Sequence, residues 1–427
     1  MKVAQLKRVW VAMVGAAAAC VAAEALAFNK PPFPRLAANW IANQNYQDPT
    51  IQSALARGSI AIVNIWPGWE NGRGTTLQQV IQNIKAINPN TLVFAYIMND
   101  QIPANRGAYQ PFAPLYAKLD AMAWYLYPTS GCSTPVTSYY PGYLTLNNTL
   151  YTPTDSNGEQ WIDWFAKWAV ANYYTPNPSL DGFSTDDVFW KPRVSGDWQR
   201  DGTTDRASDP KVQTWLRQGY VQHFTTLRQL MPGKFQIGNV ADWGDTNSVL
   251  TEYQGLLDGG VMEGMIGHDW SPETYGGWQV MMARYRRTMA ALGEPKLALF
   301  HQVGSVTDYQ SVRYGLTSAL MDDGYYVFNS TAQNGGDAPW FDEYQVQLGN
   351  AVGGPSTAAW QSGVYRRDFD NGIALVNPKG NGTQTVTLEA SFTHFTGQQA
   401  PAVNNGATVT SVTLQDRDGI ILMRSAP

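Results

Sequence analysis

The segment Leu180–Trp190 carries the residue types whose spacing best suits chemistry. It is predicted to be a short apolar strand that runs directly into two adjacent carboxylates, Asp186 and Asp187, and then into an aromatic stretch. Alternation along a strand places Asp186 on the face opposite Phe183. The bulky Phe183 suits a face covered by helices, so Asp186 would point to the other, interior side. Asp187 starts the following loop and could bind substrate hydroxyls, orient Asp186, take over its role, or cap the following segment.

The second acidic group, Glu263, stands inside the apolar run Val261–Ile266. Burying a carboxylate there without a partner would cost several kcal/mol, so such groups are paired or used. Apolar surroundings raise the pKa of a carboxyl group, which a general acid at neutral pH requires. A buried glutamate that is hydrogen-bonded for structural reasons is the alternative, and Asp242 is then the reserve acid.

Two carboxylates on facing strand ends, one ionised and one protonated, are the groups that split a glycosidic bond. We expect Asp186 to attack the anomeric carbon as the nucleophile and Glu263 to act as the general acid/base. A gap of about 5–5.5 Å between them would give retention, which we favour, and about 6.5–9.5 Å would give inversion.

The elements that must position these groups are eight apolar segments separated by amphipathic ones, between residues 28 and 352. This alternation, with strands that are apolar throughout, indicates a parallel sheet covered by helices. The fold class is therefore expected to be α/β, a (β/α)₈ TIM barrel, whose catalytic groups gather at the carboxyl ends of the strands. The strands are expected at Leu36–Ile41, Ile60–Trp66, Leu92–Met98, Gly182–Asp186, Phe235–Val240, Val261–Ile266, Leu297–Val303 and Gly324–Asn329, and helices at Thr76–Ile87, Glu159–Tyr173, Lys211–Met231, Thr274–Leu292 and Tyr309–Met321.

Polar and aromatic residues follow these strands and could bind hydroxyl groups or stack on sugar rings. The long connection Asn99–Leu180, between the third and fourth strands, is expected to shape substrate binding. A single histidine such as His301 suits a hydrogen-bonded core position equally well. The expected substrate-binding residues are Asp187, Trp40, Trp66, Asn99, Trp190, Asn239, Asp242, Asp269, Trp270 and His301.

Composition excludes several classes of function. Charged residues make up 15% of the 427 residues, the net charge is −5 and no basic run is present, which argues against a nucleic acid partner. The four histidines lack the spacing of metal ligands, and no phosphate loop, nucleophile elbow or dinucleotide motif occurs. We therefore expect no cofactor and no metal, a polysaccharide or oligosaccharide as the partner, and a monomer.

The first 27 residues are predicted to be an export signal. A basic start precedes an apolar run rich in alanine and valine, and Ala25–Ala27 supplies small residues for cleavage. The mature protein would be periplasmic or extracellular and free of the membrane, with lipidation at Cys20 as the less favoured alternative. Cleavage after Ala27 would leave Cys132 as the one cysteine, so no disulfide within the chain is expected.

A small antiparallel β-sandwich domain is expected at residues 353–427, after the turn-rich break Gly353–Ser356. Alternating runs are separated by Asn-Gly or Asp-Gly pairs that are typical of hairpin turns, at residues 371–372, 405–406 and 418–419. The runs are Gly363–Asp368, Gly372–Asn377, Thr383–Leu388, Ala407–Leu414 and Gly419–Met423.

The quoted motifs resemble those of known barrels. Asp181–Asp187 is similar to the Asp-Gly-x-x-x-Asp strand end of α-amylase-like and α-galactosidase-like barrels, in which Asp186 matches the nucleophile. Most of Pro34–Met423 resembles glycoside hydrolase-like barrels related to endo-α-1,4-polygalactosaminidases, which pair that strand with a later Met-Glu-Gly strand, here 262–264, and with a β domain that opens like 366–378. The chain departs from the amylase pattern at Ser184, where amylases have arginine, and in carrying its acid on strand six.

The interpretation favoured by the sequence is a secreted glycoside hydrolase that cleaves α-linkages of a polysaccharide through Asp186 and Glu263. A non-catalytic glycan-binding or scaffolding barrel is the alternative from another functional class. A transglycosylase is a further possibility.

Overall fold

The structure is a computed structural model that describes residues 28–108, 110–129, 131–239, 252–333 and 335–424. The expected export signal at 1–27, with Cys20, and the reserve acid Asp242 lie outside the described residues. In the described part of the chain, no helix combines the length and apolarity that crossing a bilayer requires. Cys132 is a free cysteine.

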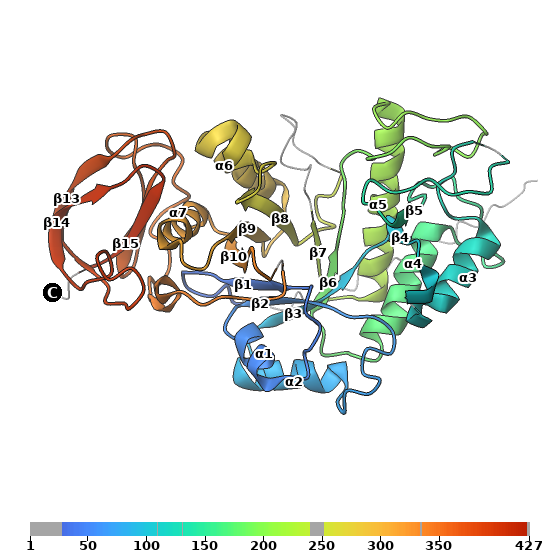
Figure 1. The fold of residues 1–427 in the computed structure, drawn as a ribbon, viewed down its shortest axis with the longest axis horizontal. Coiled ribbons are helices and arrows are strands. Elements are labelled where there is room, and N and C mark those ends of the chain that lie inside the picture. Colours follow the sequence, from blue (N-terminus) through green and yellow to red (C-terminus); the bar gives the residue numbers. More distant parts are fainter. Residues whose placement is uncertain (1–27, 109, 130, 240–251, 334, 425–427) are drawn as a thin grey trace, which may run out of the picture.

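Eight parallel strands form the barrel in the order in which they occur along the chain (Figure 1). The first and last strands close it, because the Tyr326 amide donates to the Arg35 carbonyl oxygen at 2.8 Å. All eight expected strands are confirmed, with ends shifted by at most two residues. They are β1 Ala37–Trp40, β2 Ile60–Asn64, β3 Leu92–Ile97, β6 Gly182–Thr185, β7 Phe235–Asn239, β8 Gly259–Ile266, β9 Leu297–Gly304 and β10 Tyr325–Ser330.

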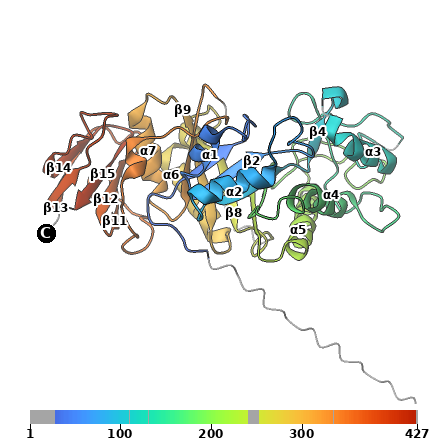
Figure 2. The ribbon, with the colours of Figure 1, turned by 90° about the horizontal axis from the view of Figure 1, so that it is seen from below.

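Helices cover the outside of this sheet (Figure 2). Side-chain caps set three of their starts: Asp48 accepts from the Thr50 amide at 2.8 Å, Thr76 from the Gln79 amide at 3.1 Å and Asp308 from the Ser311 amide at 3.0 Å. The expected helices are confirmed, and the one expected at Glu159–Tyr173 runs into one turn of π-helix, η3 Val170–Tyr174. The helices are α1 Pro49–Leu55, α2 Leu77–Ile87, α4 Trp161–Ala169, α5 Pro210–Leu230, α6 Pro272–Ala291 and α7 Tyr309–Ala319.

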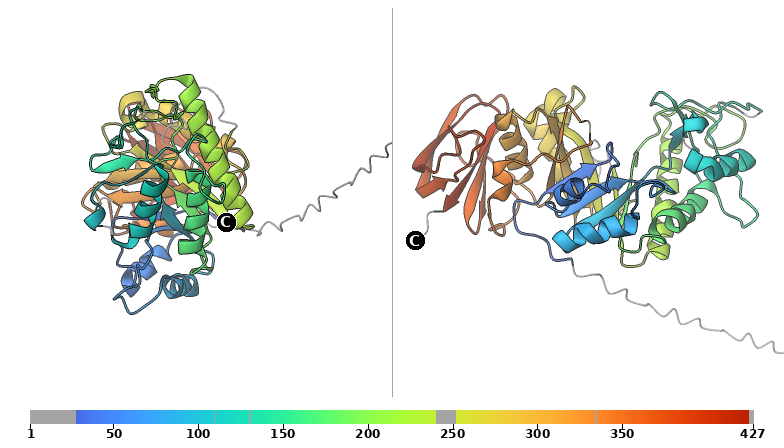
Figure 3. Two further views of the ribbon diagram at one scale, coloured as in Figure 1. Left: turned by 90° about the vertical axis from the view of Figure 1, so that its right-hand side faces the viewer. Right: turned by 60° about the horizontal axis from the view of Figure 1, so that its bottom comes forward.

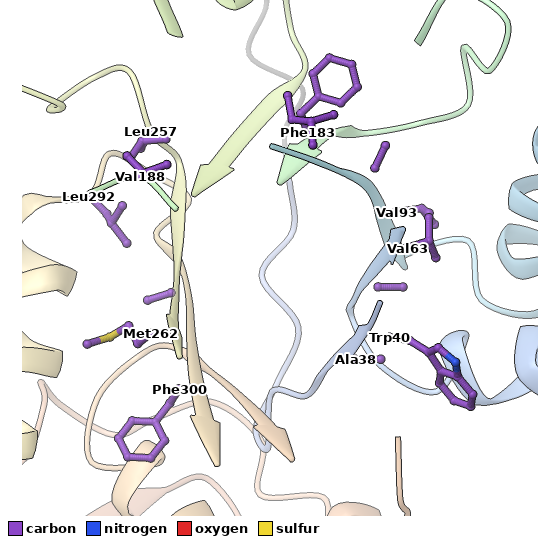
Figure 4. Close-up of a cluster of buried hydrophobic side chains, with 14 of the residues drawn as sticks. Ala38, Trp40, Val63, Val93, Phe183, Val188, Leu257, Met262, Leu292 and Phe300 are labelled. Carbon is purple, nitrogen blue, oxygen red and sulfur yellow. The ribbon is translucent and has the colours of Figure 1, made fainter. Parts of the chain in front are cut away.

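The alternation of side chains along the strands separates two apolar cores. One set fills the barrel interior, including Ile62, Phe94 and Leu299. The other faces the helices and includes Val93 and Phe183 (Figure 4). Phe183 thus lies on the helix side, as the sequence predicts, and Asp186 on the interior side.

Two strands begin with the same Asp-Gly pair, and each pair fixes a strand to its neighbour. Asp181 accepts a hydrogen bond from the Val93 amide at 2.7 Å, and Asp258 accepts one from the Gln236 amide at 2.7 Å. Gly182 is required at this point because a Cβ there would lie 1.8 Å from a carbonyl oxygen of β7. These contacts at the amino ends of β6 and β8 hold the two strands whose opposite ends carry Asp186 and Glu263.

The connection between β3 and β6 is the large insertion that the sequence predicts, and it projects to one side of the barrel (Figure 3). Its strands β4 Gln101–Pro103 and β5 Tyr143–Thr145 pair antiparallel. Between them lie two 3₁₀ turns, η1 Arg106–Ala108 and η2 Gln110–Phe112, and helix α3 Ala113–Met122.

The carboxyl-terminal part is a separate five-stranded antiparallel sheet with its own apolar cluster, which fits the expected β-sandwich domain. The Asp418-Gly419 pair is not a hairpin turn, which corrects the expectation, because β14 and β15 are not neighbours in the sheet. The strands, in the order β11-β12-β15-β13-β14, are β11 Tyr365–Phe369, β12 Gly372–Asn377, β13 Gln384–His394, β14 Thr408–Leu414 and β15 Asp418–Arg424. A 3₁₀ turn, η5 Asp342–Gln345, precedes them.

Asp418 instead anchors this domain to the barrel. Its carboxylate lies 3.0 Å from Nη2 of Arg313 in α7, and Nε of Arg313 also donates to the Gly419 carbonyl oxygen at 3.1 Å. Both side chains are buried. A buried pair of this kind is costly to break, because the remaining charge has no counterpart.

We expect the substitution Asp418→Ala to lower the free energy of unfolding by about 3–5 kcal/mol, because it leaves the Arg313 guanidinium buried and unpaired. Asp120→Ala removes an exposed ion pair with Arg106 and should cost less than about 1 kcal/mol. Denaturant unfolding followed by fluorescence measures both. Equal losses for the two variants would contradict the anchoring role.

Candidate active site

The interior positions at the carboxyl ends of the barrel strands form one layer of polar side chains, here called the mouth. Each comes from the face that carries the interior core lower in the same strand, so strand alternation alone brings them together. The layer contains Asn64 of β2, Tyr96 of β3, Asp186 after β6, Asn239 of β7, Glu263 of β8, His301 of β9 and Asn329 of β10.

Asp186 is half-buried and held by three hydrogen-bond donors. It accepts from the Tyr96 hydroxyl, from Nδ2 of Asn239 at 3.0 Å and from the amide of Asp187 at 2.9 Å. Burial and the negative charge of Glu263 raise the pKa of Asp186, while these hydrogen bonds act in the opposite direction. The side chain therefore has little freedom, as a nucleophile requires.

Asn239 bridges the two candidate catalytic groups. Its Nδ2 donates to Oδ1 of Asp186 at 3.0 Å and to Oε2 of Glu263 at 2.8 Å. Two straight hydrogen bonds from the diverging N–H groups of one amide would put Oδ1 of Asp186 and Oε2 of Glu263 about 5 Å apart. The prediction that Asp186 and Glu263 meet across one opening is thus supported by a shared donor.

Glu263 is exposed, so the expectation of an apolar setting for its carboxyl group was wrong. The pairing of β8 with β9 slips between Met262 and Ile266, and Gly264 adopts a left-handed φ of 58°. Glu263 has the inward parity of Val261, and this bulge directly follows it, at a kind of position where bulges often re-aim side chains beside active sites. Period-two alternation from sequence gives no sign of such a slip.

His301 supports the bulge from beneath. Its Nδ1 accepts from the Gly264 amide at 3.1 Å, and its Nε2 lies 2.9 Å from Oδ1 of Asn329. Burial lowers the pKa of His301 to about 4, so the ring is neutral and Nε2 carries the proton donated to Asn329. His301 is therefore a buried positioning residue, because both of its nitrogens are occupied.

Trp270 and Asp269 lie at the rim of the mouth after β8. The Trp270 side chain is 54% exposed and stacks on His268, with ring centroids 4.5 Å apart and planes 9° from parallel. It covers the bulge so closely that a Cβ on Gly264 would lie 2.2 Å from the indole ring. An exposed indole next to Glu263 is suited to stacking on a sugar ring.

Asp187 is buried and turned toward the insertion. Its Oδ2 accepts from Nε2 of Gln101 at 2.8 Å, and its Oδ1 lies 3.4 Å from the Tyr140 hydroxyl. Burial, then the charges of Asp186 and Glu263, raise the pKa of Asp187 to about 8, against the hydrogen bond from Gln101 that lowers it. Asp187 is therefore protonated at neutral pH.

Asp100 adds a fourth carboxyl group to this region. Burial, followed by the charges of Asp187 and Asp186, raises its pKa well above the ordinary value. Among the residues that the structure describes, no group of three or more acidic, histidine or cysteine side chains has the geometry of a metal site.

Three expected substrate-binding residues lie away from the mouth. Trp40 faces the helices and is buried there (Figure 4), because side chains alternate along β1 and this position points out of the barrel. Asn99 is buried in the insertion, where its Oδ1 accepts from Asn148 at 3.1 Å. Trp190 is half-buried against α5, with a guanidinium carbon 3.8 Å above its ring. Trp66, by contrast, is half-buried beside Tyr96 in the wall of a cavity next to the mouth.

The prediction from sequence noted Tyr96 as a polar aromatic residue at a strand end but did not include it among the expected site residues, and it missed Gln101 and Tyr140 as functional candidates. Tyr96 shares the inward parity of Phe94 near a strand end, so alternation could have selected it. Gln101 and Tyr140 come from an irregular insertion, where no periodic signal exists.

The raised pKa of Asp187 makes a prediction about stability. Its carboxyl group is ionised above about pH 4 in the unfolded chain but stays protonated to about pH 8 in the folded protein. The free energy of unfolding should therefore fall as the pH rises from about 4 to about 8. Asp187→Asn removes this loss, and asparagine tolerates the left-handed φ of 51° at this position.

We expect Asp187→Asn to gain at least about 1 kcal/mol over the wild type on going from pH 4 to pH 8. Urea unfolding at several pH values measures the difference, and Asp201→Asn on an exposed loop is the control. If the difference in free energy of unfolding between Asp187→Asn and the wild type does not change with pH, Asp187 is ionised in the folded protein.

Comparisons with known proteins bear on the fold and the family. Eubacterium rectale Amy13B has a similar structure, with a TM-score of 0.51 and 8% identity, covering 93% of this chain and 98% of that chain. An Anoxybacillus alpha-amylase gives 0.48 and 11% over 92% and 97% of the two chains. The glycoside hydrolase domain of PelA from Pseudomonas aeruginosa gives 0.43 and 12% over 71% and 97%. At these identities only the first similarity carries weight, and it supports the barrel fold.

No curated protein matches the chain. The family model described as hypothetical glycosyl hydrolase family 15 matches residues 85–373, which include β6, β8 and the whole insertion. Because this match spans more than half of the sequence, the chain belongs to hypothetical glycosyl hydrolase family 15 and is a glycoside hydrolase.

Proposed function

We propose that this protein hydrolyses glycosidic bonds of a polysaccharide, with Asp186 as the nucleophile and Glu263 as the general acid/base. The observation that carries the proposal is the amide of Asn239, which binds both carboxylates at 3.0 and 2.8 Å. A separation of about 5 Å between carboxylates is typical of retaining glycosidases.

The surroundings of the two groups support these roles. Asp186 is held by three donors that favour its ionised form, which a nucleophile needs. Its Oδ1 already accepts two hydrogen bonds and its Oδ2 accepts one, so Oδ2 is the freer oxygen for attack. Glu263 is exposed and has the Asn239 amide as its described donor, so it can exchange protons with a leaving group and with water.

The reaction then has two steps. In the first, Asp186 attacks the anomeric carbon while Glu263 gives its proton to the departing oxygen, leaving a covalent glycosyl-enzyme. In the second, the Glu263 carboxylate removes a proton from water, which attacks the same carbon and releases Asp186. The Tyr96 hydroxyl and the Asn239 amide can stabilise the Asp186 carboxylate when it leaves.

The charges around the mouth bear on the class of glycan. Burial, and then the charges of neighbouring carboxyl groups, raise the pKa values of Asp100, Asp186 and Asp187. An acidic polysaccharide would add like charges to this region, so we propose a neutral or basic glycan. Trp270 at the rim offers a face for one sugar ring.

We further propose that the scissile bonds are α-linkages, supported by the resemblance of Asp181–Asp187 to the strand ends of α-amylase-like barrels. Export, with action in the periplasm or outside the cell, is proposed from the basic and apolar pattern of residues 1–27.

The test combines a substrate panel with matched variants. Purified protein is incubated with bacterial exopolysaccharides and with plant and fungal glycans, and the products are read by mass spectrometry. We expect Asp186→Asn and Glu263→Gln each to lower the rate at least about 100-fold while glycan binding survives. Asp201→Asn is the control and should keep the activity. Glycan binding without turnover in the wild type would favour a non-catalytic binding protein instead.

The spacing across Asn239 also predicts the stereochemistry. We expect the anomeric configuration of the first product to match that of the substrate, as observed by proton NMR during early turnover. Inversion would mean that a water molecule occupies the gap and that Asp186 acts as a base.

A further inference from the structure

A large cavity lies beside the mouth, between the barrel and the insertion. Its volume is about 570 Å³, within the range of pockets that hold small organic groups. Its wall is formed by the loop after β2, the end of β3, the paired strands β4 and β5, α3, α4 and the π-helix. Apolar side chains dominate it, among them Trp66, Phe112, Leu115, Trp161, Phe165 and Trp168.

The aromatic wall is firmly held. The indole nitrogen of Trp161 donates to the carbonyl oxygen of Asn99 at 3.0 Å and to Oδ1 of Asn148 at 2.9 Å. The ring centroid of Phe165 lies 5.0 Å from that of Trp161 and 5.7 Å from that of Trp168. The π-helix that follows α4 adds Tyr173, and such turns are frequent at functional sites.

The cavity adjoins the hydrogen-bond donors of two carboxyl groups of the mouth. Tyr96, which donates to Asp186, and Gln101, which donates to Asp187, both belong to its wall. Its inner end is therefore one side chain away from each carboxyl group. To reach the cavity, a group attached to the substrate at the mouth would have to pass Tyr96 or Gln101.

The chemistry of the wall differs from that of the mouth. None of the described residues that line the cavity carries a formal charge, whereas the mouth holds several carboxyl groups. The polar side chains of the wall are the amides Gln44, Asn64 and Gln101 and three tyrosines, so a sugar unit that filled the cavity would still place many of its hydroxyl groups against apolar side chains, which is unfavourable. An uncharged apolar group would instead fill the space and release water.

We propose that this cavity is a subsite for an uncharged apolar group, alkyl or aryl, that is linked to the glycan. The inference rests on the proposed function, since the group would be presented by a glycoside bound at Asp186 and Glu263. It would make the natural substrate a glycan that bears a hydrophobic aglycone or substituent.

Calorimetric titration of the full protein with three glucosides tests this. n-Octyl glucoside, below its micelle concentration, and phenyl glucoside separate the alkyl and aryl sources, and methyl glucoside is the reference. We expect at least one of the apolar glucosides to bind about tenfold or more tightly than methyl glucoside. Equal binding of all three would overturn the proposal.

Variants locate the binding. Leu115→Trp fills the cavity and Phe112→Lys puts a charge in its wall, and each should remove the preference for the apolar glucoside. Ile87→Trp, at an exposed position of α2, adds the same indole elsewhere and should leave the preference intact. Circular dichroism identifies variants that fold.

If a folded Leu115→Trp or Phe112→Lys variant keeps the preference for the apolar glucoside, the apolar group binds outside the cavity. That result would contradict the proposal. Calorimetry measures binding independently of hydrolysis, so the two proposals can fail separately. If the protein hydrolyses a plain polysaccharide but binds the three glucosides equally, only the subsite inference is refuted. Apolar binding in a protein that cleaves no glycan would refute only the proposed function.

Discussion

The shared hydrogen bonding of Asn239 is the constraint on which the site depends. One amide nitrogen holds an oxygen of Asp186 and an oxygen of Glu263, and so sets the gap that a sugar ring and its anomeric carbon must occupy. For this to happen, β6, β7 and β8 must be adjacent and parallel, and their inward positions must reach the same height. The Asp-Gly pairs at the amino ends of β6 and β8 fix that register from the opposite side of the barrel.

The concentration of carboxyl groups at the mouth has a cost in stability that the surrounding donors reduce. Asp186 is surrounded by a phenol, an amide side chain and a backbone amide, and Asp187 keeps its proton instead of its charge. A fold selected for stability alone would separate these groups. Their retention side by side, on rigid strand ends, is what a reaction with a developing positive charge on the sugar would require.

Much of the fold and part of the site follow from the sequence, because barrel strands are apolar throughout and alternate with period two. The inward placement of Asp186 and Asn239 could be predicted from the residues beside them. The same rule could have excluded Trp40, whose parity is outward. It could not foresee the exposure of Glu263, because a register slip at Gly264 breaks the alternation. Contacts from the insertion, such as Gln101 with Asp187, join residues far apart in the chain and have no local signal.

The strands carry the catalytic groups and the insertion lines the cavity, which suggests how the specificity for substrate is determined. The reacting carboxylates come from strand ends, where backbone pairing with both neighbours restricts movement. Gln101 belongs to the insertion and contributes both to the hydrogen bonding of Asp187 and to the wall of the apolar cavity. A group that fills the cavity would therefore press on the same side chain that supports a carboxyl group of the mouth. Because the insertion leaves the barrel after β3 and returns before β6, its lining can change while β6, β7 and β8 keep their spacing, so substrate choice can vary without loss of the catalytic geometry.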